Sequence, residues 1–328
     1  MPDLILKSQR FRAEREADWK RLESLLAKAE RSAGRLSREE LLELPVLYRQ
    51  ALSSLSVARS ISLDQGLIDY LESLSTRAYF FVYGARSTLL ERIGRFFARD
   101  WALSVQSLWR ETLAAAGVMA LGIAVAYLLF GQNPEWFYAF VPEGMAGGRD
   151  PMASTAALRE TLYSDKGEAW LSVFAAFLFT NNAQVSLFAF ALGFALCVPT
   201  AAVLLYNGLT AGAMIALFAS HGLAFEFVGW LMIHGVTELF AIALSGAAGF
   251  RIGWSIIFPG ERPRIEAAAQ AGRTAATVMA GVVIMLMIAG VLEGIGRQTI
   301  NADVARYAIA AVSLVVWLAF FYAPRKPA

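Results

Sequence analysis

The sequence contains a single cysteine, Cys197, among 328 residues. One cysteine excludes a disulfide within the chain and a metal site built from several thiolates. The sequence also lacks a phosphate-binding loop, a glycine-rich nucleotide fingerprint and a serine nucleophile elbow. We therefore expect a protein that is not an enzyme and that has neither a cofactor nor a metal site. A net charge of +2 gives no reason to expect nucleic-acid binding.

Charge is scarce over most of the chain. Residues 1–111 hold 18 of the 29 Lys and Arg residues and 15 of the 27 Asp and Glu residues, whereas 57% of the whole sequence is hydrophobic. This distribution predicts two parts, a helical domain of soluble type over residues 1–111 and a transmembrane helical domain over residues 112–328. The predicted fold class is an all-α, polytopic membrane protein with an N-terminal cytoplasmic helical domain.

Helical patterns fill the N-terminal domain. Residues 9–33 place apolar side chains at helical spacing between charged ones, which indicates an amphipathic helix. Ser37 and Glu40 have the spacing of a capping box that opens the next helix. Further helices are expected at about 45–60 and 62–98. The resulting bundle is either a structural platform or a docking domain for partners, and the sequence leaves both open.

Arginine and aromatic residues gather at the expected membrane surface. This group combines cationic side chains with amphipathic rings, which suits the headgroup layer of the cytoplasmic leaflet and predicts contact with membrane lipids. Its members are Arg92, Arg95, Arg99, Trp101, Trp109 and Arg251.

About six membrane spans follow from the apolar runs, because a spanning helix needs roughly 20 apolar residues. They are expected at 112–130, 183–206, 209–220, 225–250, 275–292 and 307–322. The short segment 209–220 either crosses the membrane or re-enters it. Loop 131–169 is acidic, whereas loop 251–274 and the C-terminal tail are basic. The positive-inside rule therefore places both termini in the cytoplasm of a bacterium and the acidic loop outside the cytoplasmic (inner) membrane.

His234 and Glu238 are four residues apart, on one face of a helix that continues through Ala241, Ser245 and Gly249. Ionisable residues within a membrane helix suggest a proton or ion site, or a polar gate. The alternative is an interhelical clasp. We favour the clasp because no second carboxylate is clearly in mid-span. A zinc protease would require HExxH, which this HxxxE pattern does not supply.

Further polar residues complete a candidate intramembrane site. Glu293 lies at the outer end of the fifth span, and Asn181 and Asn182 lie where the acidic loop meets the second. Asn207 interrupts an apolar run. It marks either a broken transporter helix or an ordinary hairpin turn, and we favour the hairpin.

Three glycine pairs have the GxxxG spacing that permits close helix packing, within the chain or between the protomers of a homo-oligomer. The pairs are Gly208 and Gly212, Gly249 and Gly253, and Gly290 and Gly294.

In combination, several stretches resemble the stage II sporulation protein M family of integral membrane proteins. They are Trp19 with Arg21-Leu22-Glu23, Leu44-Pro45 with Leu47-Tyr48-Arg49, Arg77-Ala78 with Tyr83, Phe179 with Asn181-Asn182 and Gly193, Asn207-Gly208 with Gly212, His234-Gly235 with Glu238-Leu239, and Ala289-Gly290 with Glu293. The resemblance covers nearly the whole chain.

The resemblance implies a membrane anchor that holds protein partners together. The sporulation member is an anchor for cell-wall enzymes, and the extended, non-sporulation branch is associated with AAA+ ATPases and von Willebrand A-domain proteins. We therefore expect a non-enzymatic membrane scaffold, involved in envelope or cell-wall processes. The alternative is a transporter or permease-like component that uses the His234–Glu238 pair.

Overall fold

The computed structural model describes residues 2–31, 36–60, 64–83, 88–163, 168–296 and 299–324, without the side chains of 2–10, 31, 168–179 and 295. These residues form helices and no strand, which confirms the predicted all-α class. The chain divides into two compact units, Met1–Leu90 and Glu91–Ala328. The basic tail at 325–328 and positions 164–167 of the acidic loop lie outside the described residues.

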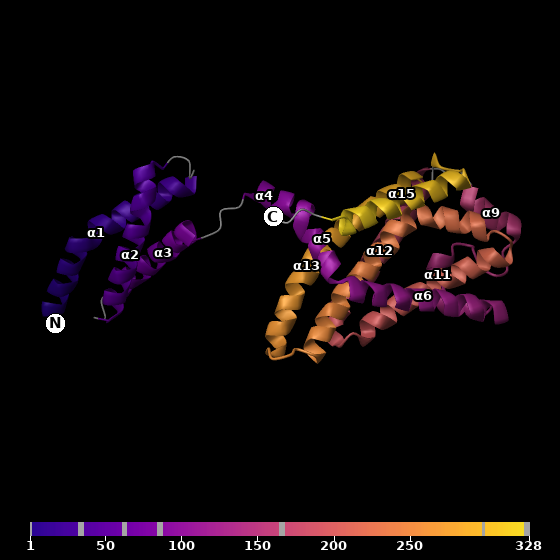
Figure 1. The fold of residues 1–328 in the computed structure, drawn as a ribbon, viewed down its shortest axis with the longest axis horizontal. Helices are drawn as coiled ribbons and strands as arrows, with labels where there is room; N and C mark the ends of the chain where they lie inside the picture. The colour runs from indigo at the N-terminus through magenta and orange to yellow at the C-terminus, as the bar shows by residue number, and fades with distance from the viewer. Residues whose placement is uncertain are drawn as a thin grey trace. The chain divides into compact units, whose positions relative to one another are not determined.

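Three helices make the first unit: α1 (Pro2–Arg31), α2 (Arg38–Ser60) and α3 (Gln65–Tyr83) (Figure 1). Their amphipathic patterns converge on one apolar core. Trp19 is 1% exposed and packs at the centre with Leu22 and Leu71. The predicted amphipathic helix is thus confirmed, because the apolar stripe of α1 faces the other two helices.

The capping box at the start of α2 is confirmed. The Ser37 N–H donates to a Glu40 carboxylate oxygen at 2.8 Å, and the Glu40 N–H donates to the Ser37 hydroxyl at 3.2 Å. The helix therefore begins at Arg38 and runs through Pro45, rather than beginning near residue 45. The single helix predicted over 62–98 is also wrong, because α3 ends at Tyr83 and α4 (Leu89–Arg95) is a separate helix.

The second unit holds the apolar helices. Its elements are the C-terminal part of α4, a π-helical turn η2 (Phe96–Asp100), α5 (Trp101–Ser107), α6 (Trp109–Gln132), α7 (Trp136–Phe140), α8 (Glu143–Ala146), α9 (Thr155–Tyr163), α10 (Glu168–Ala191), a 3-10 turn η3 (Leu192–Ala195), α11 (Val198–Ser220), α12 (Ala224–Ile257), α13 (Arg264–Val291), a π-helical turn η4 (Leu292–Gly296) and α15 (Asp303–Tyr322).

Five helices within the described residues are long and apolar enough to cross a membrane: α6, α11, α12, α13 extended to Gly294, and α15. The protein is therefore polytopic. Helix α12 is the central one, between α6 and α11 on one side and α13 and α15 on the other (Figure 1). In its most apolar window 61% of the residues are buried, against 22% to 39% in the other four, so its side chains face mainly protein.

The predicted spans 183–206 and 209–220 are wrong. Helix α11 runs without interruption from Val198 to Ser220, so Asn207 and Gly208 lie inside a helix and not in a hairpin. The chain turns instead at Leu196 and Cys197, whose φ angles of 61° and 72° are left-handed. Pro199 then lies in the first turn of α11, where a proline is compatible with a helix because its missing N–H is not needed.

Trp101, which was predicted at the membrane surface, is buried within the protein. It is 2% exposed and packs against Trp317 and Phe321 of α15, with ring centroids 6.0 and 5.3 Å away. Gly281 of α13 admits the indole, because any Cβ there would overlap the ring. Residues around Trp101, which the sequence grouped with the N-terminal domain, therefore pack inside the second unit.

The other residues predicted at the membrane surface differ in their surroundings. Trp109 is 50% exposed. Arg92 and Arg99 lie on the exposed surface of α4 and η2, and Arg95 there is 3.5 Å from Asp100. Arg251 donates to Glu111 at 2.6 Å and to the Ser107 carbonyl, so it ties α12 to the start of α6.

Two glycine pairs lie at close helix crossings. A Cβ on Gly208 or Gly212 would overlap a carbonyl oxygen of α6, and one on Gly249 would overlap the Ala189 carbonyl of α10. A Cβ on Gly253 would lie 2.7 Å from the Gly193 carbonyl oxygen. A Cβ on Gly294, by contrast, would meet nothing within 4 Å among the described residues, so none of these crosses close to it.

Helices α7 to α9 form a cap over one end of the bundle. Phe137, Val141 and Leu158 are buried in a cluster with residues of α6, α11 and α12. The Thr210 hydroxyl of α11 donates to the Phe140 carbonyl at 2.8 Å. The described part of the predicted acidic loop is therefore a folded cap.

Candidate functional site: a polar cavity in the membrane unit

A cavity of about 130 Å³ lies between α10, α11, α12 and the cap. Its lining combines apolar residues with a set of polar and ionisable ones. The polar set is Arg149, Asn181, Asn182, Asn207, Thr210, His234 and Glu238. A concave site of mainly apolar character with a few converging polar groups is typical of a ligand-binding pocket.

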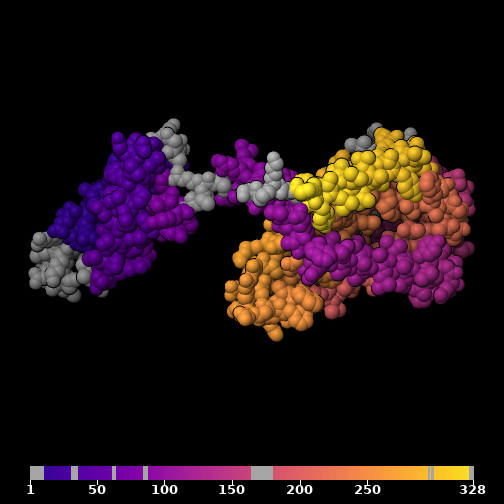
Figure 2. Space-filling view, viewed as in Figure 1, coloured from indigo at the N-terminus to yellow at the C-terminus, as the bar shows by residue number. Residues whose placement is uncertain are grey.

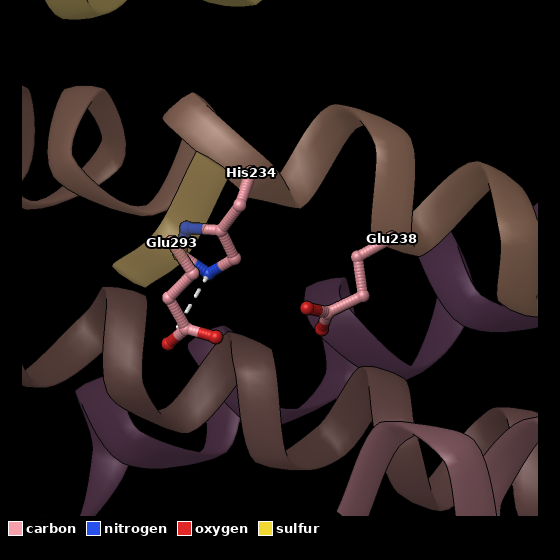
Figure 3. Close-up of side chains that lie close together, drawn as sticks. All are labelled: His234, Glu238 and Glu293. Atoms are coloured by element: carbon pink, nitrogen blue, oxygen red, sulfur yellow. Dashed lines mark ion pairs between the residues drawn. The ribbon is translucent and has the colours of Figure 1, made fainter. Parts of the chain in front are cut away.

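His234 and Glu238 project from the same side of α12 toward Glu293, which comes from η4 (Figure 3). The His234 Nε2 atom is 4.0 Å from a Glu293 carboxylate oxygen. One ligand atom from each of the three side chains lies within 4.8 Å of the others. The side chains of His234 and Glu293 are 4% and 2% exposed, and Glu238 is half-buried beside the cavity. Three ionisable groups thus meet inside the second unit.

The face of α12 that continues from this cluster packs on protein, as predicted. Ala241, Ser245 and Gly249 are all buried. The Ser245 hydroxyl donates to the Ala241 carbonyl at 3.0 Å, which satisfies its polar group within the helix. Small side chains on this face let the neighbouring helices approach closely. The cluster therefore lies on the protein-facing side of α12.

Three asparagines border the cavity from two further helices. Asn181 and Asn182 of α10 are joined by a hydrogen bond of 3.2 Å between their side-chain amides. Asn207 of α11 has its amide nitrogen 3.9 Å from the Met119 sulfur. Each amide offers both a donor and an acceptor, so this wall can bind polar ligands of either kind.

Arg149 brings a positive charge from the cap. It is only 7% exposed, and its guanidinium donates to the Ala146 carbonyl at 2.9 Å and to the Met145 carbonyl at 3.0 Å. The sequence analysis assigned Arg149 to the outer loop and missed its place in the cavity. No local pattern marks it, because its burial depends on how the cap folds onto α11 and α12.

The cap is fastened to α15 by Arg306, whose side chain is fully buried. Its guanidinium donates to Asp303 at 3.0 Å and to the Leu162 carbonyl at 2.9 Å, and it lies 4.8 Å above the Tyr163 ring. The Tyr163 hydroxyl donates to Asp303 at 2.8 Å. Burial, and then this hydrogen bond, raise the pKa of Tyr163 to about 12. Sequence analysis did not single out Arg306.

The fold and the cavity define the class of this protein: a polytopic α-helical membrane protein with an internal polar site. A family model described as Stage II sporulation protein M matches residues 76–296, and the chain belongs to this family. That match contains the whole ionisable cluster. No curated protein and no solved structure matches the chain.

The first unit matches a different family model, described as a domain of unknown function (DUF8413), over residues 9–84. The resemblance stated above for Trp19 and for residues 44–49 therefore lies outside the Stage II sporulation protein M match. The two matches meet near the end of α3, close to the division between the two compact units.

Proposed function

We propose that the second unit binds a polar solute or an ion in its internal cavity and acts as a transporter or permease-like component. The observation that carries this proposal is the meeting of His234, Glu238 and Glu293 beside the cavity. We favoured a clasp because no second carboxylate is clearly in mid-span in the sequence. Glu293 supplies one, and ionisable groups that gather inside a membrane mark substrate or ion pathways.

Access to the cavity from both sides of the membrane is the property that tests this proposal. Met214 lines the cavity, so Met214→Cys in a Cys197→Ser background places one reporter thiol there. We expect a membrane-impermeant thiol reagent to label it both in intact cells and in inside-out vesicles. Ala213→Cys is the matched control, because Ala213 is fully buried and does not line the cavity. Labelling from one side only, or from neither, contradicts transport.

The second candidate is a non-enzymatic scaffold, and an observation in the first unit favours it. A surface groove of about 370 Å³ there is bordered by Leu52, Tyr79 and Phe80, whose exposed fractions are 39%, 51% and 66%. Exposed apolar patches of this kind often bind other proteins. The expected partners are those that the family resemblance implies: an AAA+ ATPase, a von Willebrand A-domain protein or cell-wall enzymes.

A photo-crosslinking amino acid at Phe80 tests the scaffold in native membranes. The scaffold predicts one stoichiometric protein partner, which mass spectrometry would name. A probe at Lys20, whose side chain is 71% exposed and outside the groove, is the control. Equal yields at both positions contradict a groove-specific partner, and crosslinks to a second copy would indicate a homo-oligomer.

We also propose that the protein lies in a bacterial inner membrane with both termini in the cytoplasm. The charge at the two ends of the helices supports this orientation: residues 251–274, which run from the end of α12 into α13, carry Arg251, Arg262, Arg264 and Arg273, whereas the cap is acidic. An epitope tag inserted after Met152, which is 87% exposed, should be accessible from outside the cell. A tag at 260–261 should not be, and the reverse pattern overturns the orientation.

A further inference from the structure

From the geometry of His234, Glu238 and Glu293 we infer that these residues bind a divalent transition-metal cation of the zinc class. The inference rests on the proposed binding function of the cavity and names the class of its ligand. It also departs from the expectation of no metal site. The HxxxE pattern of His234 and Glu238 supplies two metal ligands, and Glu293 from η4 supplies a third.

The donor set suits this class of cation. One imidazole nitrogen and two carboxylate oxygens are ligands that zinc accepts, with three protein ligands and an open fourth position in sites that exchange their ligands. Imidazole favours transition metals over magnesium and calcium, which prefer oxygen ligands alone. The open position here would face the cavity, since His234 and Glu238 line it.

The distances allow one ion to be held by all three side chains. Ligands around a tetrahedral zinc are about 3.4 Å apart, since each bond is about 2.1 Å. The 4.0 Å between His234 and Glu293, and the 4.8 Å limit for the whole group, exceed this separation by less than about 1.5 Å. A gap of this size is within the reach of a rotamer change in a glutamate side chain.

The charge of the site points the same way. Two carboxylates, those of Glu238 and Glu293, meet in the cluster, and Glu238 also lines the cavity. Two carboxylates this close together repel each other when both are ionised, and charge inside a membrane is costly. A bound dication compensates the carboxylates directly.

Metal content of the purified full-length protein tests the inference. The protein should carry a tag without histidine and be dialysed in detergent against buffered Zn²⁺. We expect one zinc per chain, and a thermal unfolding temperature that rises with the Zn²⁺ concentration, because a ligand that binds the folded state stabilises it. His234→Ala and Glu293→Gln should each weaken binding at least tenfold.

Matched controls exist within the chain. His221 is the other histidine and lies outside the cluster, hydrogen-bonded to Leu217, so His221→Ala should retain the zinc. Glu266→Gln should retain it as well, because Glu266 is an exposed carboxylate of α13. Size-exclusion profiles establish that each variant is folded. If His234→Ala is not, the wild-type stoichiometry and the isosteric Glu238→Gln and Glu293→Gln variants decide the question.

Two results overturn the inference. In the first, the wild-type protein contains no more zinc than the Glu293→Gln variant. In the second, the His234→Ala and Glu293→Gln variants both retain the full zinc content. Neither result changes the thiol labelling of Met214→Cys from the two sides. Zinc binding with labelling from one side alone would establish the metal site and reject transport. Two-sided labelling without zinc would support transport of a different solute.

Discussion

The two units have opposite interiors. The first unit buries Trp19, Leu22 and Leu71 and carries its ion pairs on the surface, for example Arg21 with Glu43 at 2.8 Å. The second unit buries ionisable residues, such as His234, Glu293 and Arg306. Its outside is apolar: α6 and α15 expose Leu113, Leu121, Val312, Val315 and Val316. The first unit therefore fits an aqueous solvent and the second fits lipid, because a charged surface is stable in water and an apolar surface is stable in lipid.

The surface of the second unit has a feature that matches this contrast. Between α6 and α15 it is hollowed toward α12 (Figure 2), in a groove of about 530 Å³ that includes Leu113, Leu239 and Leu318. The groove is lined mainly by apolar side chains, so hydrocarbon chains can fill it. His234 and Glu293, by contrast, are buried in the interior of this unit.

The most direct way to break the polar interior is Arg306→Leu. It leaves Asp303 and the Leu162 carbonyl without the buried guanidinium that they contact. Removing one partner of a buried ion pair costs roughly 3–5 kcal/mol. We expect this decrease in the free energy of unfolding to lower the thermal unfolding temperature of the protein in detergent, as monitored by size exclusion. Arg159→Leu is the control, because Arg159 is 58% exposed at the side chain and its pair with Glu226 spans 3.7 Å. Equal losses for the two variants would show that burial of Arg306 is not important.

The apolar interior of the first unit is broken by Trp19→Ala. Truncating a buried tryptophan costs about 3–5 kcal/mol through lost burial and the cavity left behind. Denaturant unfolding should show the transition of the first unit shifting while that of the second stays. Leu42→Ala, at a position 70% exposed, should leave both transitions unchanged. A common shift of both transitions would mean that the units do not unfold separately.

Local chemistry in the sequence was sufficient for several features. The capping box determined where α2 begins, and the spacing of His234, Ala241 and Ser245 identified the protein-facing side of α12. In these cases the interacting groups are within a few turns of each other. The Asn207-Gly208 dipeptide led to the wrong prediction of a hairpin turn, because this dipeptide also occurs inside a membrane helix, where glycine permits a close crossing.

Features that depend on distant residues were not predictable. Trp101 beside several arginines has the composition of a headgroup anchor, and its burial depends on Gly281 of α13 and on the rings of α15 that it contacts. Arg149 and Glu293 reach the cavity or its cluster through the folding of the cap and of η4. No periodicity within either segment encodes those contacts, so the sequence listed Glu293 in the candidate site without showing that it meets His234 and Glu238.

Helix spacing in the second unit is tested by Gly208→Val. The added side chain would overlap the Met119 carbonyl of α6 and force the two helices apart. Overpacking of this kind costs about 1–3 kcal/mol. Gly294→Val is the matched control with the same added volume, because its Cβ would meet nothing within 4 Å. Thermal unfolding in detergent should rank Gly208→Val well below Gly294→Val, and the opposite order would contradict a close crossing at Gly208.

The smallest expected effect concerns the surface ion pairs of the first unit. The hydrogen bond from Lys28, and then that from the Ser37 N–H, hold the pKa of Glu40 below its ordinary value of 4.5. A carboxyl group with a lowered pKa in the folded state contributes stability above its unfolded pKa, and this contribution disappears as the pH falls through the folded value. The unfolding midpoint of the first unit should therefore decrease as the pH falls below about 4.5. Glu40→Gln should flatten that dependence in urea titrations at several pH values, whereas Glu39→Gln, the neighbouring acidic residue, should not. Since the ion pair of Lys28 and Glu40 is on the surface, high salt should also weaken the contribution of Glu40 to stability. The buried contacts of Arg306 should be almost insensitive to salt.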